Sequence, residues 1–371
     1  MNPTRGRLIF TVTNDLNYDQ RMIRICSTLQ SAGYQVRLIG RKKSDSTALV
    51  NRSFEQHRLF CFFQHGKFFY IEYNLRLFLY LLFQKFDLAC AIDLDTILPI
   101  YFSCRLKRKK WVYDAHEYFT EVPEVVGRPR IKLMWEKLAN WLLPKSKYNY
   151  TVGPKLAQIF KQRYGQEFEV IRNVPFKKVI DRPKKAQNQP FTVIYQGALN
   201  EGRGIEASLQ AFQYLESAQL WIVGEGDLSL SLRQMAESLK LGDKVKFWGY
   251  QQPEALKDIT AQADLGLNLL ENKGLSYYYS LANKFFDYIQ AGLPSLNMAF
   301  PEYQAIMKNY QTGILLEHLD ATKIAAEIQD LMDRPETYQA MSTICRKAAE
   351  EYNWENEQEK LLQFYETVLT P

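Results

Sequence analysis

The sequence lacks any apolar run of the roughly 18–20 residues that a membrane-spanning helix needs. Its longest candidate, Leu77–Phe83, is short and lies between Arg76 and Lys85. The first residues lead into the short apolar stretch Leu8–Thr13, with no small-residue cleavage site of the kind that follows a signal peptide. We therefore expect an intracellular, cytoplasmic protein.

Cysteine and histidine are also scarce. The five cysteines form no Cys-x-x-Cys pair, which disfavours a disulfide framework and a zinc ribbon. The four histidines form neither His-x-x-x-His nor His-Glu-x-x-His. We expect buried thiols in a reducing compartment and no metal site.

What the sequence does contain is typical of a globular protein: 371 residues, of which 46% are hydrophobic and 24% are charged. This composition excludes a disordered chain, a collagen-like fibre and a coiled coil. Residues 1–200 hold 33 Lys and Arg against 16 Asp and Glu, whereas the remainder holds 14 against 25. This asymmetry indicates two domains, the basic one suited to an anionic membrane, a polyanionic substrate or nucleic acid.

Short apolar runs alternate with helical patterns along most of the chain, which predicts parallel sheets covered by helices on both faces. The fold class is therefore α/β, with two Rossmann-like domains facing across a cleft. The expected boundaries are 1–175 for the first domain, 176–190 for a linker, 191–352 for the second domain and 353–371 for a terminal helix. Strands are expected at 8–13, 35–40, 87–92, 110–114, 148–152 and 167–172, and at 191–196, 220–223, 245–248, 265–270, 295–299 and 313–317.

The second half has three segments that suit an anionic ligand. Gly197–Gly204 joins a strand to a helix, and its glycines allow close backbone approach while Arg203 can clamp a phosphate. Glu225 lies in a second, weaker glycine turn. A third segment begins a helix with Ser280 as its cap, and Asn283, Lys284 and Asp287 follow at helical spacing. The alternatives are plain turns and an ordinary helix surface.

The first half has candidate polar residues at strand ends. His116 follows a strand and has acids on both sides, although a lone histidine is often structural. Asn14 and Asp15 begin a polar loop, Asn14–Asn17, that follows the first strand and points to the cleft between the domains. Asp15 and Asn17 are equally suited to a turn and a helix cap. The aromatic and basic segment Arg58–Lys85 is either a core helix or a surface that touches a bilayer.

In this order, the glycine loop with Arg203, the turn at Val223–Asp227, Gly249-Tyr250 and the segment Asn283–Pro294 resemble retaining glycosyltransferases of family-4 type, with the GT-B fold. The resemblance implies that the C-terminal domain binds a nucleotide sugar such as a UDP- or GDP-sugar, with no other cofactor. Gly197 and Arg203 would then lie at the diphosphate, and Tyr250 at the base. Glu225, Ser280 and Asn283 join the same donor-binding set.

The chain departs from the family pattern at three places. Ala198 stands where the family has the first of two cations, which shifts part of that task to Lys284. Of two family acids eight positions apart, the ribose-binding one matches Asp287, whereas the other falls on Tyr279, so Glu271 is the candidate substitute. The loop Asn14–Asn17 replaces a Gly-Gly pair.

By the same resemblance, His116 lies near the transferred sugar, and we name His116 and Glu271 as candidate catalytic residues. The implied reaction is metal-independent transfer to a glycan or lipid-linked acceptor in polysaccharide biosynthesis, with retained configuration. We expect docking of residues 58–85 on an anionic membrane surface, at the inner face of the cell membrane, and no nucleic acid. The alternatives are a sugar-nucleotide epimerase of GT-B form and a non-enzymatic polyanion-binding protein.

Overall fold

The computed structural model describes residues 5–178 and 189–370. The chain divides into two compact units, the first formed by residues 1–173 and 357–371 and the second by residues 174–356. The sequence analysis places the corresponding changes at 175 and 353. Residues 179–188, most of the expected linker, lie outside the described residues.

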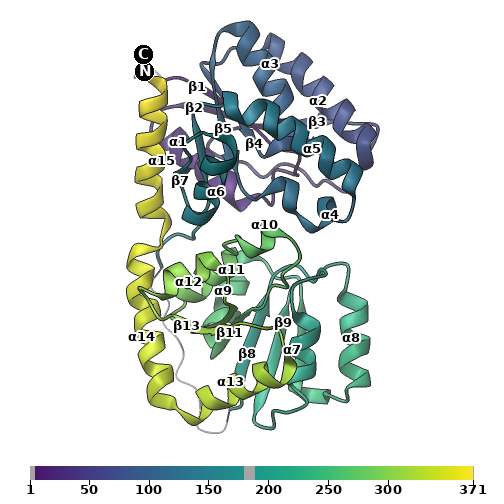
Figure 1. Cartoon of the computed structure of the whole chain (residues 1–371), viewed down its shortest axis with the longest axis vertical. Coiled ribbons are helices and arrows are strands. Elements are labelled where there is room, and N and C mark those ends of the chain that lie inside the picture. Colours follow the sequence, from purple (N-terminus) through teal and green to yellow (C-terminus); the bar gives the residue numbers. More distant parts are fainter. Residues whose placement is uncertain (1–4, 179–188, 371) are drawn as a thin grey trace. The chain divides into compact units, whose positions relative to one another are not determined.

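The first unit is built on a seven-stranded sheet in the order β3-β2-β1-β4-β5-β6-β7, and every neighbouring pair is parallel (Figure 1). Its strands are β1 (Arg7–Thr11), β2 (Gln35–Lys42), β3 (Glu55–Phe60), β4 (Leu88–Ile92), β5 (Lys110–Ala115), β6 (Asn149–Thr151) and β7 (Glu169–Val170). The direction of strand order reverses between β1 and β4. In parallel α/β sheets, ligands bind beyond the carboxyl ends of the strands at such a point.

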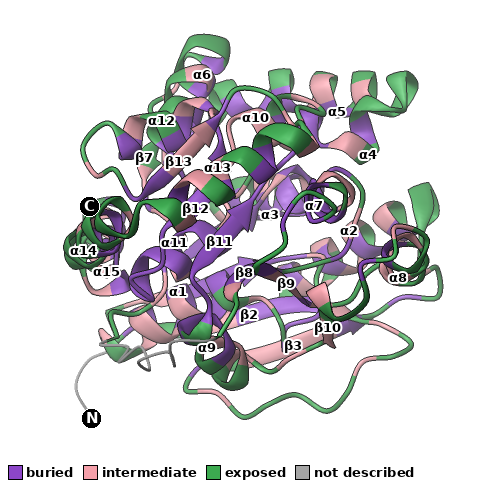
Figure 2. Cartoon of the chain, turned by 90° about the horizontal axis from the view of Figure 1, so that it is seen from below, coloured by how far each residue is buried: buried purple, intermediate pink, exposed green. Residues whose placement is uncertain are grey.

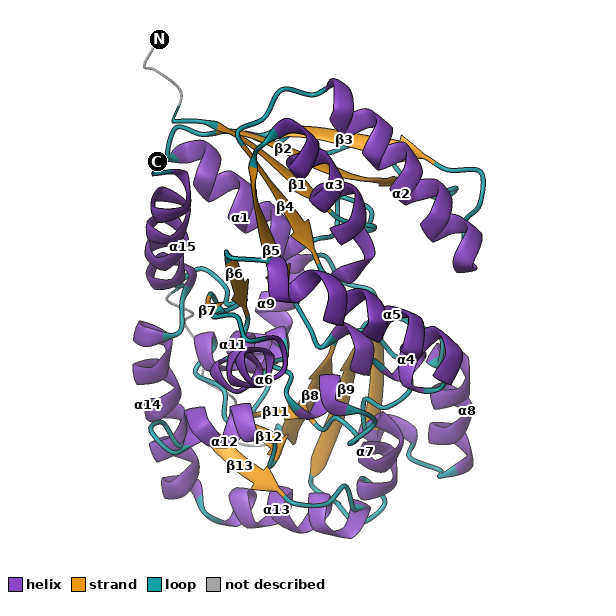
Figure 3. Cartoon of the chain, turned by 45° about the horizontal axis from the view of Figure 1, so that its top comes forward, coloured by secondary structure: helices purple, strands orange, loops and turns teal. Residues whose placement is uncertain are grey.

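Helices cover both faces of this sheet (Figure 3). They are α1 (Gln20–Ser31), α2 (Gly66–Phe83), α3 (Ile97–Lys107), α4 (Pro123–Val126), α5 (Pro129–Leu142) and α6 (Pro154–Tyr164), with short 3₁₀ turns η1 (Leu94–Thr96), η2 (Phe119–Glu121) and η3 (Leu143–Lys145). Helix α1 begins where Asp19 accepts a hydrogen bond from the Met22 amide, and its apolar residues at helical spacing are buried.

The sequence analysis missed strand β3. Its sequence, EQHRLF, contains one buried residue, Leu59, because β3 is the edge strand and faces solvent along much of its length. A polar edge strand has neither the apolar run nor the strict alternation that identifies a buried strand.

The second unit contains a six-stranded parallel sheet in the order β10-β9-β8-β11-β12-β13. Its strands are largely buried (Figure 2). They are β8 (Phe191–Gln196), β9 (Ala218–Val223), β10 (Val245–Gly249), β11 (Leu265–Asn268), β12 (Ser295–Met298) and β13 (Gly313–Leu316). The strand order reverses between β8 and β11. The prediction of two parallel α/β sheets is confirmed.

The remaining elements of the second unit are mostly helical. They are α7 (Ile205–Ala211), α8 (Ser229–Ser238), η4 (Gly242–Lys244), α9 (Pro253–Gln262), α10 (Leu275–Tyr278), α11 (Asn283–Gln290), α12 (Pro301–Met307), α13 (Ala321–Asp333) and α14 (Pro335–Glu351). Helix α11 is amphipathic, and it buries Phe285, Tyr288 and Ile289 against the sheet.

The tail is two helices, and the second begins one residue after the start of the terminal helix expected at 353–371. Helix α14 ends at Glu351, and α15 (Trp354–Leu369) starts where the Asn353 side chain accepts a hydrogen bond from the Asn356 amide. From Glu357 onward α15 belongs to the first unit, where Tyr365 is fully buried and its ring lies 5.8 Å from that of Phe10.

Candidate functional site

Three loops of the second unit meet at the carboxyl ends of β8, β9 and β10. The Gly197 amide donates to the Val223 carbonyl, and the Gly224 amide donates to the Gly249 carbonyl. A Cβ atom on Gly224 would lie 2.0 Å from the Gly197 carbonyl oxygen, so only glycine fits there. The glycines predicted to bring the backbone close to a ligand therefore also bring these loops close to one another.

Two cations lie in this part of the unit. Lys284 is 9% exposed, and its Nζ lies 3.7 Å from the centre of the Tyr195 ring. The guanidinium of Arg203 lies 5.0 Å from the centre of the Tyr277 ring, and its buried Nε has no hydrogen-bond partner among the described residues. Burial, followed by the nearby charge of Arg203, lowers the pKa of Lys284 well below its usual range. A buried amine and an unsatisfied guanidinium donor are suited to an anion.

Gly197 lies next to this amine. A Cβ atom there would be in ordinary contact with Lys284 Nζ, at 3.5 Å, but Gly197 has a φ of +131°, which side chains rarely adopt. The structure therefore brings together Gly197, Arg203 and Lys284, which the sequence analysis predicts as donor-binding residues.

Asp287 lies one turn beyond Lys284 on α11, half-buried, and accepts a hydrogen bond of 3.1 Å from Gln196 Nε2. Asn283 is the first residue of α11 and is exposed. The prediction that Ser280 caps this helix is wrong. The cap position is Ala282, and the Ser280 hydroxyl instead donates to the Tyr277 carbonyl, closing the turn after α10.

The other predicted donor-site residues lie on neighbouring loops. Glu271 forms an ion pair with Lys273, and its amide donates to the Gly202 carbonyl, which ties this loop to the glycine loop. Glu225 pairs with Arg233 at 3.3 Å. Tyr250 is 57% exposed.

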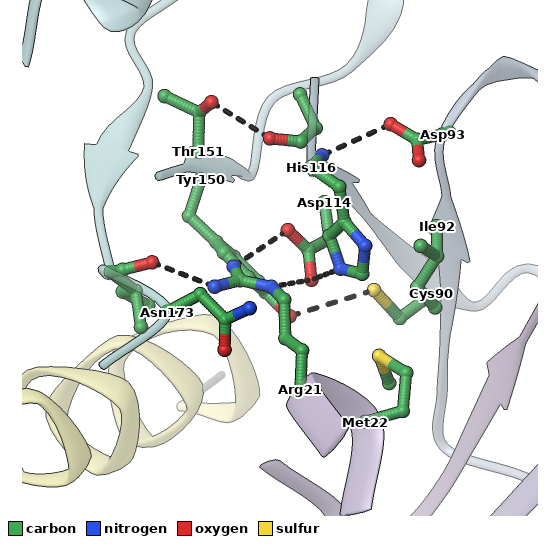
Figure 4. Close-up of polar contacts among 12 residues, drawn as sticks. Arg21, Met22, Cys90, Ile92, Asp93, Asp114, His116, Tyr150, Thr151 and Asn173 are labelled. Atoms are coloured by element: carbon green, nitrogen blue, oxygen red, sulfur yellow. Dashed lines mark hydrogen bonds and ion pairs between the residues drawn. The ribbon is translucent and has the colours of Figure 1, made fainter. Parts of the chain in front are cut away.

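The first unit holds a buried charged cluster at the end of β5, drawn in Figure 4. Arg21 Nη2 lies 2.9 Å from Asp114 Oδ1, and both side chains are almost fully buried. His116 Nε2 lies 3.1 Å from the other oxygen of Asp114. Despite burial, the charges of Arg21 and His116 keep the pKa of Asp114 below its usual value, and Asp114 raises the pKa of His116. The Asp114 carboxylate thus fixes the orientation of the His116 ring through its Nε2 atom.

The sequence analysis missed Asp93 and Asp95, which follow β4 at the point where the strand order reverses. The His116 amide donates to Asp93 Oδ1, and the Thr13 hydroxyl donates to Asp95 Oδ2. Asp93 has a φ of +54°, an unusual backbone for a residue other than glycine. The sequence does contain a signal for these two residues, because Asp-Leu-Asp directly follows an apolar run that is typical of a buried strand. Among the described residues, no three His, Cys, Asp or Glu side chains converge to hold a metal ion.

We expect the stability of the folded protein to depend on pH through the buried carboxyl of Asp95. Burial raises its pKa from 3.8 to about 6, so between these values the folded state binds a proton that the unfolded state lacks. Stability from this group is therefore present below pH 3.8 and is lost as the pH rises through about 6. The loss is up to about 3 kcal/mol, at roughly 1.4 kcal/mol per pH unit. Urea unfolding from pH 4 to 7 measures it.

Asp95→Asn removes this proton while its amide oxygen still accepts from Thr13, so its stability falls less than that of the wild type over this range. The exposed Asp330→Asn serves as the control and follows the wild-type curve. Parallel curves for the wild type and Asp95→Asn would contradict the assignment.

Asn14 and Asp15 lie in the loop after β1. Asp15 accepts from Arg58 Nη2 at 2.6 Å and from the Asn17 amide, and its side chain is 7% exposed. Asn14 Nδ2 donates to Asp19, the cap of α1. These contacts favour the turn-and-cap alternative for this loop.

Comparison with solved structures identifies the fold. Sucrose-phosphate synthase from Thermosynechococcus elongatus superposes with a TM-score of 0.79 at 18% identity, covering 98% of both chains. Alr3699/HepE from Anabaena, solved in complex with UDP, gives a TM-score of 0.73 at 13% identity over 97% of this chain and 100% of that one. The two sheets define the GT-B glycosyltransferase fold, so the fold that the resemblance predicts is confirmed.

Part of the sequence matches a family model and a curated relative. Residues 176–348 match the family model described as glycosyl transferases group 1. The lipopolysaccharide core biosynthesis glycosyltransferase LpsD of Rhizobium meliloti (strain 1021) is 24% identical over 190 residues, or 50% of this chain. This match spans about half the length of that relative, 53%.

Proposed function

We propose that the protein is a glycosyltransferase that moves a sugar from a nucleotide-sugar donor to a glycan or lipid-linked acceptor. The observation that carries the proposal is the convergence of Gly197, Arg203 and Lys284 beyond the carboxyl end of β8, where two cations lie close together and the buried Arg203 Nε has no hydrogen-bond partner among the described residues. The match to the glycosyl transferase family covers this same unit. A nucleoside diphosphate would supply negative charge that balances these two cations.

We further propose that transfer proceeds with retained configuration and without a metal ion. The Arg203 and Lys284 cations would stabilise the charge that develops on the leaving diphosphate, which then helps to take the proton of the acceptor hydroxyl. Asp287 would accept hydrogen bonds from the ribose, and Tyr250 would contact the base. The solved relative from Anabaena holds UDP, which supports a uridine donor as the first candidate.

His116 would contact the transferred sugar. Because its Nε2 faces the ionised Asp114, the Nδ1 atom is left to meet a sugar hydroxyl. Glu271 remains our candidate for the acid that the chain lacks at Tyr279. Its position beside the glycine loop supports the proposal.

The proposal is tested by thermal shift with a panel of UDP-, GDP-, ADP- and dTDP-sugars. We expect one base to raise the melting temperature at millimolar concentration, and Asp287→Asn to reduce that shift while leaving the melting temperature of the free protein within a few degrees. The asparagine keeps the size of the side chain but loses the charge that favours hydrogen bonds from a ribose diol.

The exposed Asp330→Asn is the matched control and keeps the wild-type shift. If no nucleotide sugar stabilises the protein, the donor assignment is wrong. If Asp287→Asn responds like the wild type, Asp287 is only structural.

The alternative of a sugar-nucleotide epimerase shares the fold and the donor site. It differs in needing acids and bases at the sugar, and the clustered Asp93, Asp95 and His116 of the first unit are the feature that favours it. Conversion of the donor sugar without an acceptor would identify that activity.

A further inference from the structure

The large apolar side chains that face solvent are concentrated in the first unit. Of the 23 exposed large hydrophobic residues among those described, 18 belong to this unit. Fourteen of them lie on or next to three helices: Phe60, Phe62, Phe63, Phe68, Ile71, Leu75, Leu79, Phe83, Phe102, Leu106, Ile131, Leu133, Met134 and Trp141. We call this set the α2–α3–α5 face.

Helix α2 is apolar on two opposite sides. Phe69, Tyr73, Leu77 and Leu81 recur every fourth residue and are buried against the unit. On the opposite side, a second stripe is exposed, from Ile71 at 63% to Phe83 at 84%. A helix that only covers a core needs one apolar side, so the second stripe indicates a second apolar environment. The core-helix alternative for Arg58–Lys85 therefore describes one side of α2, whereas the opposite side is apolar and exposed.

The two other helices extend this surface. Helix α2 packs along α3, and the Tyr70 ring of α2 lies 5.6 Å from Trp135 of α5. The Phe102 ring of α3 lies 6.2 Å from Trp141 of α5. Figures 1 and 3 both show the three helices as neighbours in one layer. The exposed residues of α3 and α5 therefore continue the stripe of α2, a feature that the sequence alone does not show.

The charges in this layer are almost all positive. Residues 60–85, 97–109 and 128–142 hold eleven Lys and Arg but only two acids, Glu72 and Glu136. Both acids are neutralised, by Arg76 at 2.8 Å and by Arg163 at 3.3 Å. Two cations lie directly against exposed rings, Lys67 over Phe68 and Lys145 over Trp141 at 4.6 Å. Two of the eleven cations pair with acids outside these ranges, Lys109 with Asp87 and Lys132 with Glu121, which still leaves an excess of positive charge. Apolar side chains next to such an excess match the boundary between acyl chains and anionic headgroups.

We propose that the α2–α3–α5 face docks on a bilayer that contains anionic lipid, with its apolar side chains in the headgroup boundary. The charge excess selects this occupant over a second copy of the chain, because two copies would bring like charges together. No helix among the described residues is long and apolar enough to cross a membrane. The proposal deepens the proposed function, because it names this surface as the place where the enzyme would meet a lipid-linked acceptor. Only that part of it rests on the proposed function.

The test is flotation of the full chain with vesicles of phosphatidylcholine alone or with 30% phosphatidylglycerol. We expect binding to the anionic vesicles only, and release by 1 M salt, because salt screens the attraction. Leu75→Glu/Leu79→Glu should lower the partition constant at least tenfold, since it places two acids in the apolar stripe. Leu230→Glu, at a residue 69% exposed on α8 of the second unit, is the matched control and should change it less than twofold.

Equal recovery with neutral and anionic vesicles, or full binding by Leu75→Glu/Leu79→Glu, would overturn the proposal. The proposal would also be overturned if light scattering showed that the wild type is a dimer and that the same two substitutions make it a monomer.

UDP titration without vesicles separates the two proposals. If Leu75→Glu/Leu79→Glu binds nucleotide normally but does not float, docking is supported independently; if neither protein binds nucleotide yet the wild type floats, only the donor assignment fails.

Discussion

Arg203→Ala is expected to weaken the binding of the nucleoside diphosphate roughly 10- to 150-fold, or about 1.5–3 kcal/mol. The substitution removes a guanidinium whose buried Nε has no hydrogen-bond partner among the described residues. Since Arg203 forms no ion pair among the residues that the structure describes, the fold should remain intact. Isothermal titration with UDP and GDP measures the effect.

Lys284→Met is expected to have a comparable effect and to add a pH signature. The pKa of Lys284 is lowered by burial and by Arg203, with Tyr195 and Asp287 as its other neighbours. An arriving diphosphate favours the charged amine, so binding takes up a proton and the affinity rises as the pH falls. Lys284→Met should lose that pH dependence at pH values where the nucleotide itself does not titrate.

The control for both variants is Arg334→Ala, which removes an arginine that is 65% exposed in the same unit. It should bind nucleotide like the wild type. Unchanged affinity in both Arg203→Ala and Lys284→Met would show that the diphosphate is held elsewhere.

Arg21→Met is expected to destabilise the protein by about 3–5 kcal/mol at neutral pH, the largest effect on stability that we predict. It leaves the Asp114 carboxylate charged and fully buried without its 2.9 Å partner. In the wild type the pKa of Asp114 is lowered, so its contribution is present above pH 3.8 and is lost as the pH falls through the folded-state value. The cost of Arg21→Met should therefore shrink in acid. Chemical denaturation at pH 7 and pH 4 measures both effects.

Arg21→Met/Asp114→Asn should cost less than the sum of its single substitutions, because it leaves no unpaired charge. Arg334→Met breaks an exposed ion pair with Asp330 and should cost less than about 1 kcal/mol. Additive effects at Arg21 and Asp114 would contradict the buried pair.

The sheet architecture could be predicted from the sequence because parallel strands buried on both faces are continuous apolar runs. All residues of β8 and β9, for example, are buried or half-buried, and ten of these twelve residues lie within the expected ranges 191–196 and 220–223. The polar edge strand β3 gives no such signal. Similarly, the Asn353 side chain accepts a hydrogen bond at the start of α15, and hydrophobic periodicity does not reveal such a helix boundary.

The candidate site was predictable where one local motif carries the chemistry, as at Arg203 and Gly197. It was not predictable where distant segments combine. Arg21 reaches Asp114 across 93 positions of sequence, and Thr13 reaches Asp95 across 82. The outward stripe of α2 is a third case. Burial of Tyr73 and exposure of Leu75 depend on tertiary packing, and both residues are simply apolar in the sequence.

The central claim is that the protein cleaves a nucleotide sugar at the bond between sugar and diphosphate. The most direct measurement is ³¹P and ¹H NMR of the purified protein with the nucleotide sugar that gives the largest thermal shift. We predict slow release of the nucleoside diphosphate and a free sugar of unchanged stereochemistry at its other carbons, abolished in Arg203→Ala. An intact donor after prolonged incubation, or its conversion to an epimer, would contradict the account.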